Sequence, residues 1–185
     1  MTRIIAGAAR GRRLASPRGT ATRPTSEKVR GAVFNVLGQF FDGGDVLDLY
    51  AGTGAMALEA LSRGCRRAVC VEIDRAAAEA LRRNARACGF EERVEVRRAR
   101  VLDVLPGLPA DSFSLAFVDP PYAGGPGPAL GLLERAVAPG GRVVAEHDAS
   151  RPPDERYGAL GLVDRRDYGG TGISIYLKDR AYTPR

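Results

Sequence analysis

The sequence predicts an open, doubly wound α/β domain, in which helices cover both faces of a mostly parallel sheet. From residue 45 onward, short apolar runs alternate with helical segments, the alternation typical of βαβ units. A glycine-rich turn follows the first of these runs. Near the C-terminus, two β-rich segments are joined through glycines with no helix between them. The alternation predicts the parallel sheet, and the last two segments predict an antiparallel pair that closes it.

Strand and helix positions follow from the apolar periodicity. The expected strands are residues 45–50, 68–73, 93–97, 114–118 and 141–146, followed by the antiparallel pair 160–170 and 171–179. The expected helices are residues 54–63, 75–88, 101–105 and 127–137.

The N-terminal part is expected to form a small extension of the same single domain. The segments RIIAGA (3–8) and RRLAS (12–16) flank a short turn and predict a hairpin. The stretch RPTSEKVRGAVFNVLGQF (23–40) begins with good helix-start residues. It continues with an apolar face at helical spacing, made of Val29, Val33, Val36, Leu37 and Phe40. We therefore expect a hairpin and helix extension over residues 1–41 and a catalytic body over residues 42–185.

Composition excludes several classes of protein. No run of 18 apolar residues exists, so we expect no membrane span, and the N-terminus has no apolar run of signal-peptide length. Cys65, Cys70 and Cys88 lack CxxC spacing, and His147 is the single histidine. We therefore expect free thiols, no metal site and a cytoplasmic protein.

The positive charge is concentrated at the N-terminus. The chain carries a net charge of +6, yet residues 1–30 hold eight basic residues and one acidic residue, a net charge of +7. A nucleic acid is the natural partner of such a basic segment, and a solvated basic tail is the alternative.

The first turn of the expected sheet carries the signature of a nucleoside cofactor. Asp48 lies near the end of the first strand, Gly52 and Gly54 precede a helix, and Glu72 ends the second strand. Glycines let the backbone approach a ligand, and a carboxylate after strand two suits paired ribose hydroxyls. Binding of NAD is the alternative. The NAD-binding motif G-x-G-x-x-G tolerates alanine at its third glycine, which is the position of Ala57 in this chain. The D-x-x-x-G-x-G arrangement of Asp48, Gly52 and Gly54 resembles the first motif of class I S-adenosylmethionine methyltransferases. This resemblance implies that Asp48 faces the ammonium group of that cofactor, whereas a pyrophosphate would repel the carboxylate.

The segment AFVDPPY (116–122) predicts chemistry on an amino group. An exocyclic amino group on a nucleobase is a poor nucleophile, because its lone pair is shared with the ring. The Asp119 carboxylate and the Pro120 carbonyl can accept its N–H bonds and orient the lone pair toward a methyl donor. Pro121 stiffens the elbow, and Tyr122 offers a face on which an extruded base can stack. A strand terminator with a surface tyrosine is the alternative.

These motifs occur in one order over almost the whole chain, and together they resemble a known family. RIIAGAARGRRL, RPTSEKVRGAVFNVL, VLDLYAGTGAMALEALSRG, VEID, FVDPPY and YGGTGISIYL closely resemble the RsmD family, the bacterial 16S rRNA guanine-N2 methyltransferases. The resemblance implies a Rossmann-like class I methyltransferase fold. It implies transfer of a methyl group from S-adenosylmethionine to a guanine of 16S rRNA, in an assembled or assembling 30S subunit.

The resemblance also implies roles for individual residues. Asp119, Pro120, Pro121 and Tyr122 would form the target-base pocket. The expected cofactor-binding residues are Asp48, Tyr50, Ala51, Gly52, Thr53, Gly54, Glu72, Ile73, Asp74, Arg100, Val101 and Asp119. The expected RNA-binding residues are Arg10, Arg12, Arg13, Arg23, Thr25, Lys28 and Arg30.

Two positions depart from the family pattern. Arg100 stands where an acid or amide near the adenine is usual, so adenine recognition would rely on backbone groups near Val101 or on Asp103. Gly31 stands where the family commonly has Glu. We expect a monomer that binds no metal. The alternatives are a methyltransferase for adenine N6 or protein glutamine, an NAD-dependent oxidoreductase, and a non-catalytic RNA-binding module.

Overall fold

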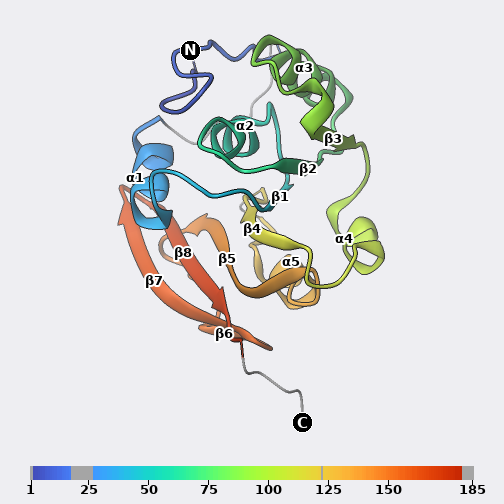
Figure 1. The fold of residues 1–185 in the computed structure, drawn as a ribbon. Coiled ribbons are helices and arrows are strands. Elements are labelled where there is room, and N and C mark those ends of the chain that lie inside the picture. Colours follow the sequence, from blue (N-terminus) through green and yellow to red (C-terminus); the bar gives the residue numbers. More distant parts are fainter. Residues whose placement is uncertain (1, 18–26, 122, 181–185) are drawn as a thin grey trace. The chain divides into compact units, whose positions relative to one another are not determined.

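A computed structural model describes residues 2–17, 27–121 and 123–180. The chain divides into two compact units, residues 1–100 and residues 101–185. The first unit contains two parallel strand pairs and the second contains one (Figure 1). The first unit contains the basic N-terminal arm and the glycine turn, and the second contains the DPPY segment.

A three-stranded parallel sheet forms the centre of the first unit. The strand order is β3–β2–β1, and Asp48 of β1 pairs with Cys70 of β2. Helix α2 packs on β1 and β2, which are buried after their first residues, while α3 packs on β3, whose residues alternate between apolar and charged and are only half-buried (Figure 1). The elements are β1 (Asp45–Leu49), α2 (Ala55–Ser62), β2 (Arg67–Val71), α3 (Arg75–Ala87), the short 3₁₀ turn η1 (Glu91–Arg93) and β3 (Val94–Arg97).

The N-terminal arm, residues 2–17, forms a loop whose two ends pair through one bridge. Arg3 and Arg13 form an isolated antiparallel bridge, and the Ile4 and Leu14 N–H groups donate to the carbonyls of Arg12 and Thr2. The predicted hairpin is therefore present only as this short pairing. No longer ladder forms here because the N–H groups of Ile5 and Ala6 donate to the Glu59 side chain of α2.

Helix α1 (Glu27–Leu37) follows the arm and is shorter than its apolar pattern predicts. Val29, Val33 and Leu37 lie on its buried face, as expected. Phe40 does not extend that face: the helix ends before Gly38, whose φ of 106° turns the chain, and Phe40 is 67% exposed.

The second unit joins one parallel strand pair to an antiparallel group. Its strand order is β4–β5–β8–β7–β6, with β4 and β5 parallel and the remaining pairs antiparallel. The strands are β4 (Phe113–Val118), β5 (Val137–Asp148), β6 (Arg156–Tyr157), β7 (Leu160–Tyr168) and β8 (Thr171–Lys178). The helical elements are α4 (Val101–Val104), the 3₁₀ turn η2 (Leu105–Gly107) and α5 (Gly127–Leu133). The parallel pairs in both units and the antiparallel strands β5, β8 and β7 confirm the predicted α/β class.

Two boundaries in the second unit differ from the sequence-based expectation. Helix α5 ends at Leu133, residues 134–136 form a turn instead of the expected last helical turn, and β5 begins at Val137 instead of residue 141. Lys178 contributes to this early start, because its ammonium group donates to the carbonyls of Glu134 and Val137. The two-residue strand β6 was not expected, and it pairs with the beginning of β7.

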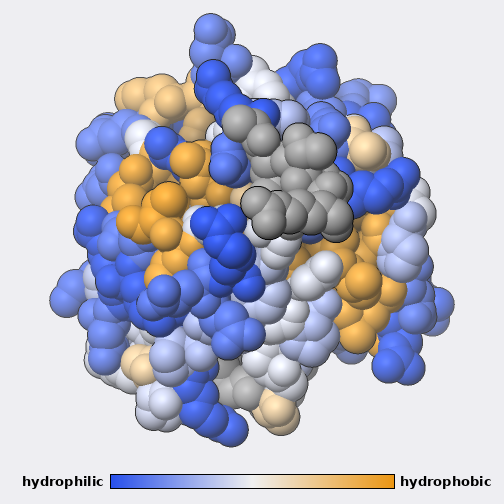
Figure 2. All heavy atoms as spheres, turned by 90° about the horizontal axis from the view of Figure 1, so that it is seen from below, coloured by the Kyte–Doolittle hydropathy of each residue, from blue (hydrophilic) through white to orange (hydrophobic). Residues whose placement is uncertain are grey.

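The core of each unit is built from the apolar faces of these elements. Figure 2 shows one face of the molecule, on which hydrophilic side chains surround separate hydrophobic patches.

None of the helices within the described ranges is long and apolar enough to cross a membrane.

Candidate functional site

The turn between β1 and α2 has the backbone conformation that close ligand approach requires. Tyr50, Gly52 and Gly54 all have positive φ angles, of 64°, 55° and 81°. Such angles suit glycine and strain other residues, so Tyr50 is an unusual occupant of this turn. A Cβ added to Gly52 would meet no atom within 4 Å, so open space lies beside the Gly52 backbone. Gly54 occupies the N-cap position of α2 and, because it has no side chain, forms no capping hydrogen bond.

The carboxylate of Glu72 supports this turn directly. Glu72 follows β2 and accepts the Gly52 N–H at Oε2 (2.7 Å) and the Asp74 N–H at Oε1 (2.8 Å). Its own N–H donates to the carbonyl of Arg97, which aligns it with the end of β3. Two carboxylate oxygens offer about four acceptor positions, so Glu72 retains capacity for two ribose hydroxyls beside these two N–H groups.

Asp48 is a buried carboxyl group at the base of the same turn. Its side chain is 3% exposed, and its Oδ2 accepts the N–H of Ala57 in the first turn of α2 (3.1 Å). Burial, opposed by the Ala57 hydrogen bond and assisted by the nearby Glu72 carboxylate, raises the pKa of Asp48 to about 7. A cationic ligand group beside Asp48 would stabilise the ionised carboxylate and lower that pKa.

The remaining expected cofactor residues occupy different environments. Ile73 is 62% exposed, an apolar surface next to Glu72 on which an adenine ring can pack. Asp74 caps helix α3 by accepting the Ala77 N–H (2.8 Å), so its side chain already has a structural task. Arg100 is exposed at the end of the first unit, and Val101 is buried at the start of α4 in the second.

The DPPY segment continues a strand of the second unit that is buried except at Ser114. β4 ends at Val118, Asp119 is half-buried and Pro120 is buried, while Pro121 is exposed. The Pro121 carbonyl accepts the N–H of Gly124 (3.2 Å), which closes the loop behind the two prolines. Tyr122 lies outside the described residues.

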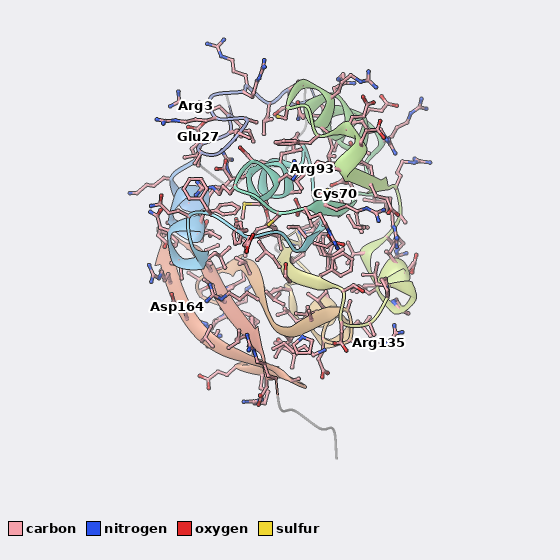
Figure 3. All side chains as sticks on the ribbon, in the orientation of Figure 1. Arg3, Glu27, Cys70, Arg93, Arg135 and Asp164 are labelled. Atoms are coloured by element: carbon pink, nitrogen blue, oxygen red, sulfur yellow. The ribbon has the colours of Figure 1, made fainter. Side chains whose placement is uncertain are left out.

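Exposed cations line a groove beside the N-terminal arm. Arg10, Arg12 and Arg13 are exposed on the arm, and Lys28 is exposed on α1. Arg3 pairs with Glu27 across the start of α1 (3.4 Å), and Figure 3 shows these two side chains side by side. The groove has a volume of about 680 Å³ and is lined by Arg3, Ile4, Ile5, Arg10, Gly11, Glu27, Lys28, Gly31, Ala32 and Asn35.

Arg30 differs from these exposed cations, although the sequence placed it in the same RNA-binding set. Its side chain is fully buried and pairs with the buried Glu59 of α2 (3.6 Å). It also donates to the Arg3 carbonyl, so it holds the arm to α1 in the interior. A phosphate cannot reach it in this conformation. Arg23 and Thr25, from the same set, lie outside the described residues.

The side chains that an alternative chemistry would use, His147, Cys65 and Cys70, are buried. His147 is 3% exposed, and its ring nitrogens contact the Asp148 carbonyl (2.8 Å) and the Ser174 hydroxyl (2.9 Å). Burial raises the pKa of the Cys65 thiol to about 12 and that of Cys70 well above its usual range, so neither is a nucleophile at neutral pH. Over the part of the chain that the structure describes, no group of three His, Cys, Asp or Glu side chains is placed to hold a metal ion.

Two buried polar residues of the first unit were missed by the sequence analysis. Glu59 accepts the N–H groups of Ile5 and Ala6 and the guanidinium of Arg63. Asn84 bonds to the arm and to the glycine turn. A signal for Asn84 exists, because it falls on the apolar face of α3 at helical spacing from Ala77, Ala80 and Leu81.

Comparisons with known proteins agree with this geometry. A family model described as "Conserved hypothetical protein 95" matches residues 2–177. The chain is 36% identical to the putative rRNA methyltransferase YlbH of Bacillus subtilis, over 95% of this chain and 98% of that protein. It is 39% identical to ribosomal RNA small subunit methyltransferase D of Escherichia coli over 73% of this chain, and the match spans 64% of that protein. A solved structure described as the putative methyltransferase yhhF from Escherichia coli superposes with a TM-score of 0.83 at 29% identity, covering 97% of this chain and 98% of that one.

Proposed function

The chain belongs to the RsmD family of rRNA methyltransferases, and from this premise we propose that it methylates the exocyclic N2 amino group of one guanine in 16S rRNA. Its cofactor is S-adenosylmethionine, and its substrate is ribosomal RNA. The observation that carries the proposal is the glycine turn with its Glu72 support, in a chain that also carries DPPY at the end of a buried strand.

The first unit offers groups that fit each part of the cofactor. The open space beside Gly52 accommodates a ligand against the backbone, and Glu72 retains acceptors for the ribose. Asp48 supplies a buried carboxylate for the ammonium of the methionine end, and exposed Ile73 supplies an apolar surface for the adenine. Tyr50, Ala51, Thr53, Gly54 and Asp74 complete the proposed contacts through the turn and the start of α3. Arg100 and Val101 remain proposed contacts of the adenine.

The sulfonium of the bound cofactor supplies an electrophilic methyl group. Asp119 and the Pro120 carbonyl accept the two N–H bonds of the guanine amino group, which orients its nitrogen lone pair toward the methyl carbon. Transfer of this methyl group to the nitrogen would leave S-adenosylhomocysteine, and the methylated nitrogen would then lose one proton, for which Asp119 is the proposed acceptor. Pro121 and Tyr122 are proposed to stiffen this pocket and to stack on the base.

RNA docking is proposed for the basic arm and the groove beside it. Arg10, Arg12, Arg13 and Lys28 are exposed cations that can reach phosphates. Of these four, Arg10 and Lys28 line the groove, and Arg12 and Arg13 lie on the arm outside its lining. Arg23 and Thr25 belong to the same proposed surface by their place in the sequence. We propose that the enzyme acts as a monomer without metal in the cytoplasm, on RNA within an assembled or assembling 30S subunit.

The decisive experiment is methylation of defined RNA followed by nucleoside analysis. The purified protein is incubated with methyl-labelled S-adenosylmethionine and 30S subunits from a strain that lacks this enzyme. Digestion and mass spectrometry are expected to show N2-methylguanosine in 16S rRNA, and Asp119→Ala serves as the inactive control. Methyl incorporation into adenine or into ribosomal protein would contradict the proposed guanine specificity.

A further inference from the structure

Asn84 connects the RNA-docking arm to the cofactor turn through one buried side chain. It lies on α3 and is 1% exposed. Its Oδ1 accepts the N–H of Ala15 in the arm (2.8 Å), and its Nδ2 donates to the Ala15 carbonyl (3.0 Å). The second Nδ2 hydrogen bond goes to the carbonyl of Thr53, in the turn between Gly52 and Gly54 (3.0 Å).

The partners fix the orientation of this amide. Two carbonyls face Nδ2 and one N–H faces Oδ1, and a flipped amide would place acceptor against acceptor at both carbonyls. Because the Asn84 side chain is buried, losing a partner leaves one of its polar atoms unsatisfied. The backbone positions of Ala15 and Thr53 are therefore tied to each other through a single rigid group.

Each of these two segments adjoins a binding surface. Ala15 follows Arg12 and Arg13, two exposed cations of the arm. Thr53 lies between the two glycines whose positive φ angles shape the cofactor turn. A ligand that fixes one segment lowers the cost of ordering the other, so binding at the two surfaces is thermodynamically linked.

We propose that Asn84 is a positioning residue that couples RNA docking at the arm to cofactor binding at the glycine turn. This inference rests on the proposed function, because it takes the arm as the RNA surface. Coupling is reciprocal: if RNA tightens cofactor binding by some factor, the cofactor tightens RNA binding by the same factor. Couplings of this kind are commonly fivefold or more.

Ser62 provides a matched control, because it anchors the arm without touching the turn. Its hydroxyl accepts the Ala9 N–H (2.9 Å) and donates to the Ala6 carbonyl, and its side chain is buried at the end of α2. Ser62→Ala and Asn84→Ala therefore both loosen the arm, and only Asn84→Ala also removes a bond to Thr53. Asn84→Asp retains the acceptor for the Ala15 N–H but loses the donated bonds to the Ala15 and Thr53 carbonyls, and it replaces Asn84→Ala if that variant does not fold.

The experiment measures the dissociation constant of 30S subunits by filter binding, without and with saturating S-adenosylhomocysteine. For the wild type we expect the ligand to tighten 30S binding about fivefold or more. For Asn84→Ala we expect this ratio to fall to about one, with weaker S-adenosylhomocysteine binding by calorimetry. For Ser62→Ala we expect weaker 30S binding with an unchanged ratio.

Three results would overturn the inference: a wild-type ratio near one, a wild-type ratio retained in the Asn84 variant, or equal loss of the ratio in both variants. Failure of the wild type to bind S-adenosylhomocysteine or 30S subunits would instead contradict the proposed function. Thermal unfolding of each variant verifies that the folded protein is compared.

Discussion

The buried carboxyl group of Asp48 makes the stability of the ligand-free protein depend on pH, and the proposed cofactor would offset that effect. The unfolded chain ionises this group near its ordinary pKa of 3.8, whereas burial raises the folded-state pKa to about 7. Between these pH values the folded state binds the extra proton, so raising the pH through this window lowers the free energy of unfolding. A cationic ligand beside Asp48 reverses that loss by pairing with the carboxylate.

Asp48→Asn is therefore expected to stabilise the ligand-free protein at pH 8 by an amount of the order of 1–3 kcal/mol. The amide oxygen can still accept the Ala57 N–H, and no buried charge remains. The gain should shrink toward pH 4, which urea unfolding at several pH values would measure.

The same variant should bind S-adenosylmethionine more weakly. In the wild type the affinity should rise with pH through about 7, whereas in the variant it should not; parallel pH profiles would contradict this account.

We expect Asp119 to act on the methyl acceptor and Glu72 to hold the cofactor. Asp119→Ala should abolish methyl transfer and leave cofactor affinity within a few-fold of the wild type. Glu72→Ala should weaken cofactor binding first, because it removes acceptors and the support of the Gly52 and Asp74 N–H groups. Calorimetric titration with S-adenosylmethionine and single-turnover rates on 30S subunits test both variants. Equal loss of cofactor affinity in the two would contradict this division.

At the scale of elements, the pattern of apolar residues predicted the positions of the first four strands. Tertiary contacts determine the end of α5 and the conformation of the arm, which the pattern did not predict. The strands β1 to β4 lie within one or two residues of the expected ranges, because β1, β2 and β4 are short, mostly apolar runs and β3 alternates between valine and charged residues. The end of α5 was missed because Lys178, distant in sequence, binds the carbonyls that follow it. The arm was expected to be a hairpin, but the N–H groups of Ile5 and Ala6 bond to Glu59 instead of a strand.

The same contacts explain which site residues the sequence could not assign. Asp48, the glycines and Glu72 have local signatures, since their spacing around one strand and one turn suggests their task. Arg30 has no such signature: its spacing along α1 places it on the buried side, but only the partner Glu59 on α2 explains why a charge is tolerated there. Asn84 likewise acquires its significance from two segments, at Ala15 and Thr53, that are remote in sequence.

The buried network that holds the arm to α2 is expected to be essential to the first unit. Burial lowers the pKa of Arg30, and the Glu59 carboxylate opposes that effect. Glu59→Gln removes the charge that compensates both Arg30 and Arg63, each almost fully buried. We expect a loss of about 3–5 kcal/mol in the free energy of unfolding, measured by urea denaturation.

Glu79→Gln is the control for this prediction. Glu79 also pairs with an arginine, Arg75, but both side chains are largely exposed. Water and salt screen such a pair, so its loss should leave the unfolding midpoint nearly unchanged. Similar midpoints for the Glu59 and Glu79 variants would show that the buried network contributes no more than a surface pair.

For the whole molecule, the segregation of charge is the property with the broadest consequence. Residues 1–30 carry a net charge of +7, although the total is +6, so the rest of the chain is close to neutral. Electrostatic attraction of RNA should therefore act on the arm and orient the molecule before any base is recognised. The buried position of Arg30 and the Arg3–Glu27 pair leave Arg10, Arg12 and Arg13 as exposed charges around the arm's turn.

Replacing Arg10, Arg12 and Arg13 together by Ala is expected to weaken RNA binding and flatten its dependence on salt. Each single-stranded phosphate contact contributes a slope of about −0.7 in log K against log salt, so losing three should reduce the slope by about two. The control replaces three exposed arginines of the second unit, Arg151, Arg156 and Arg166, and makes the same change in net charge. Filter binding of 30S subunits at several salt concentrations should give the control a slope like that of the wild type. Both triple variants should bind S-adenosylmethionine normally, because none of the six side chains lies in the glycine turn. If the arm variant keeps the wild-type slope, its arginines do not contact phosphate, and the segregated charge has a task other than RNA docking.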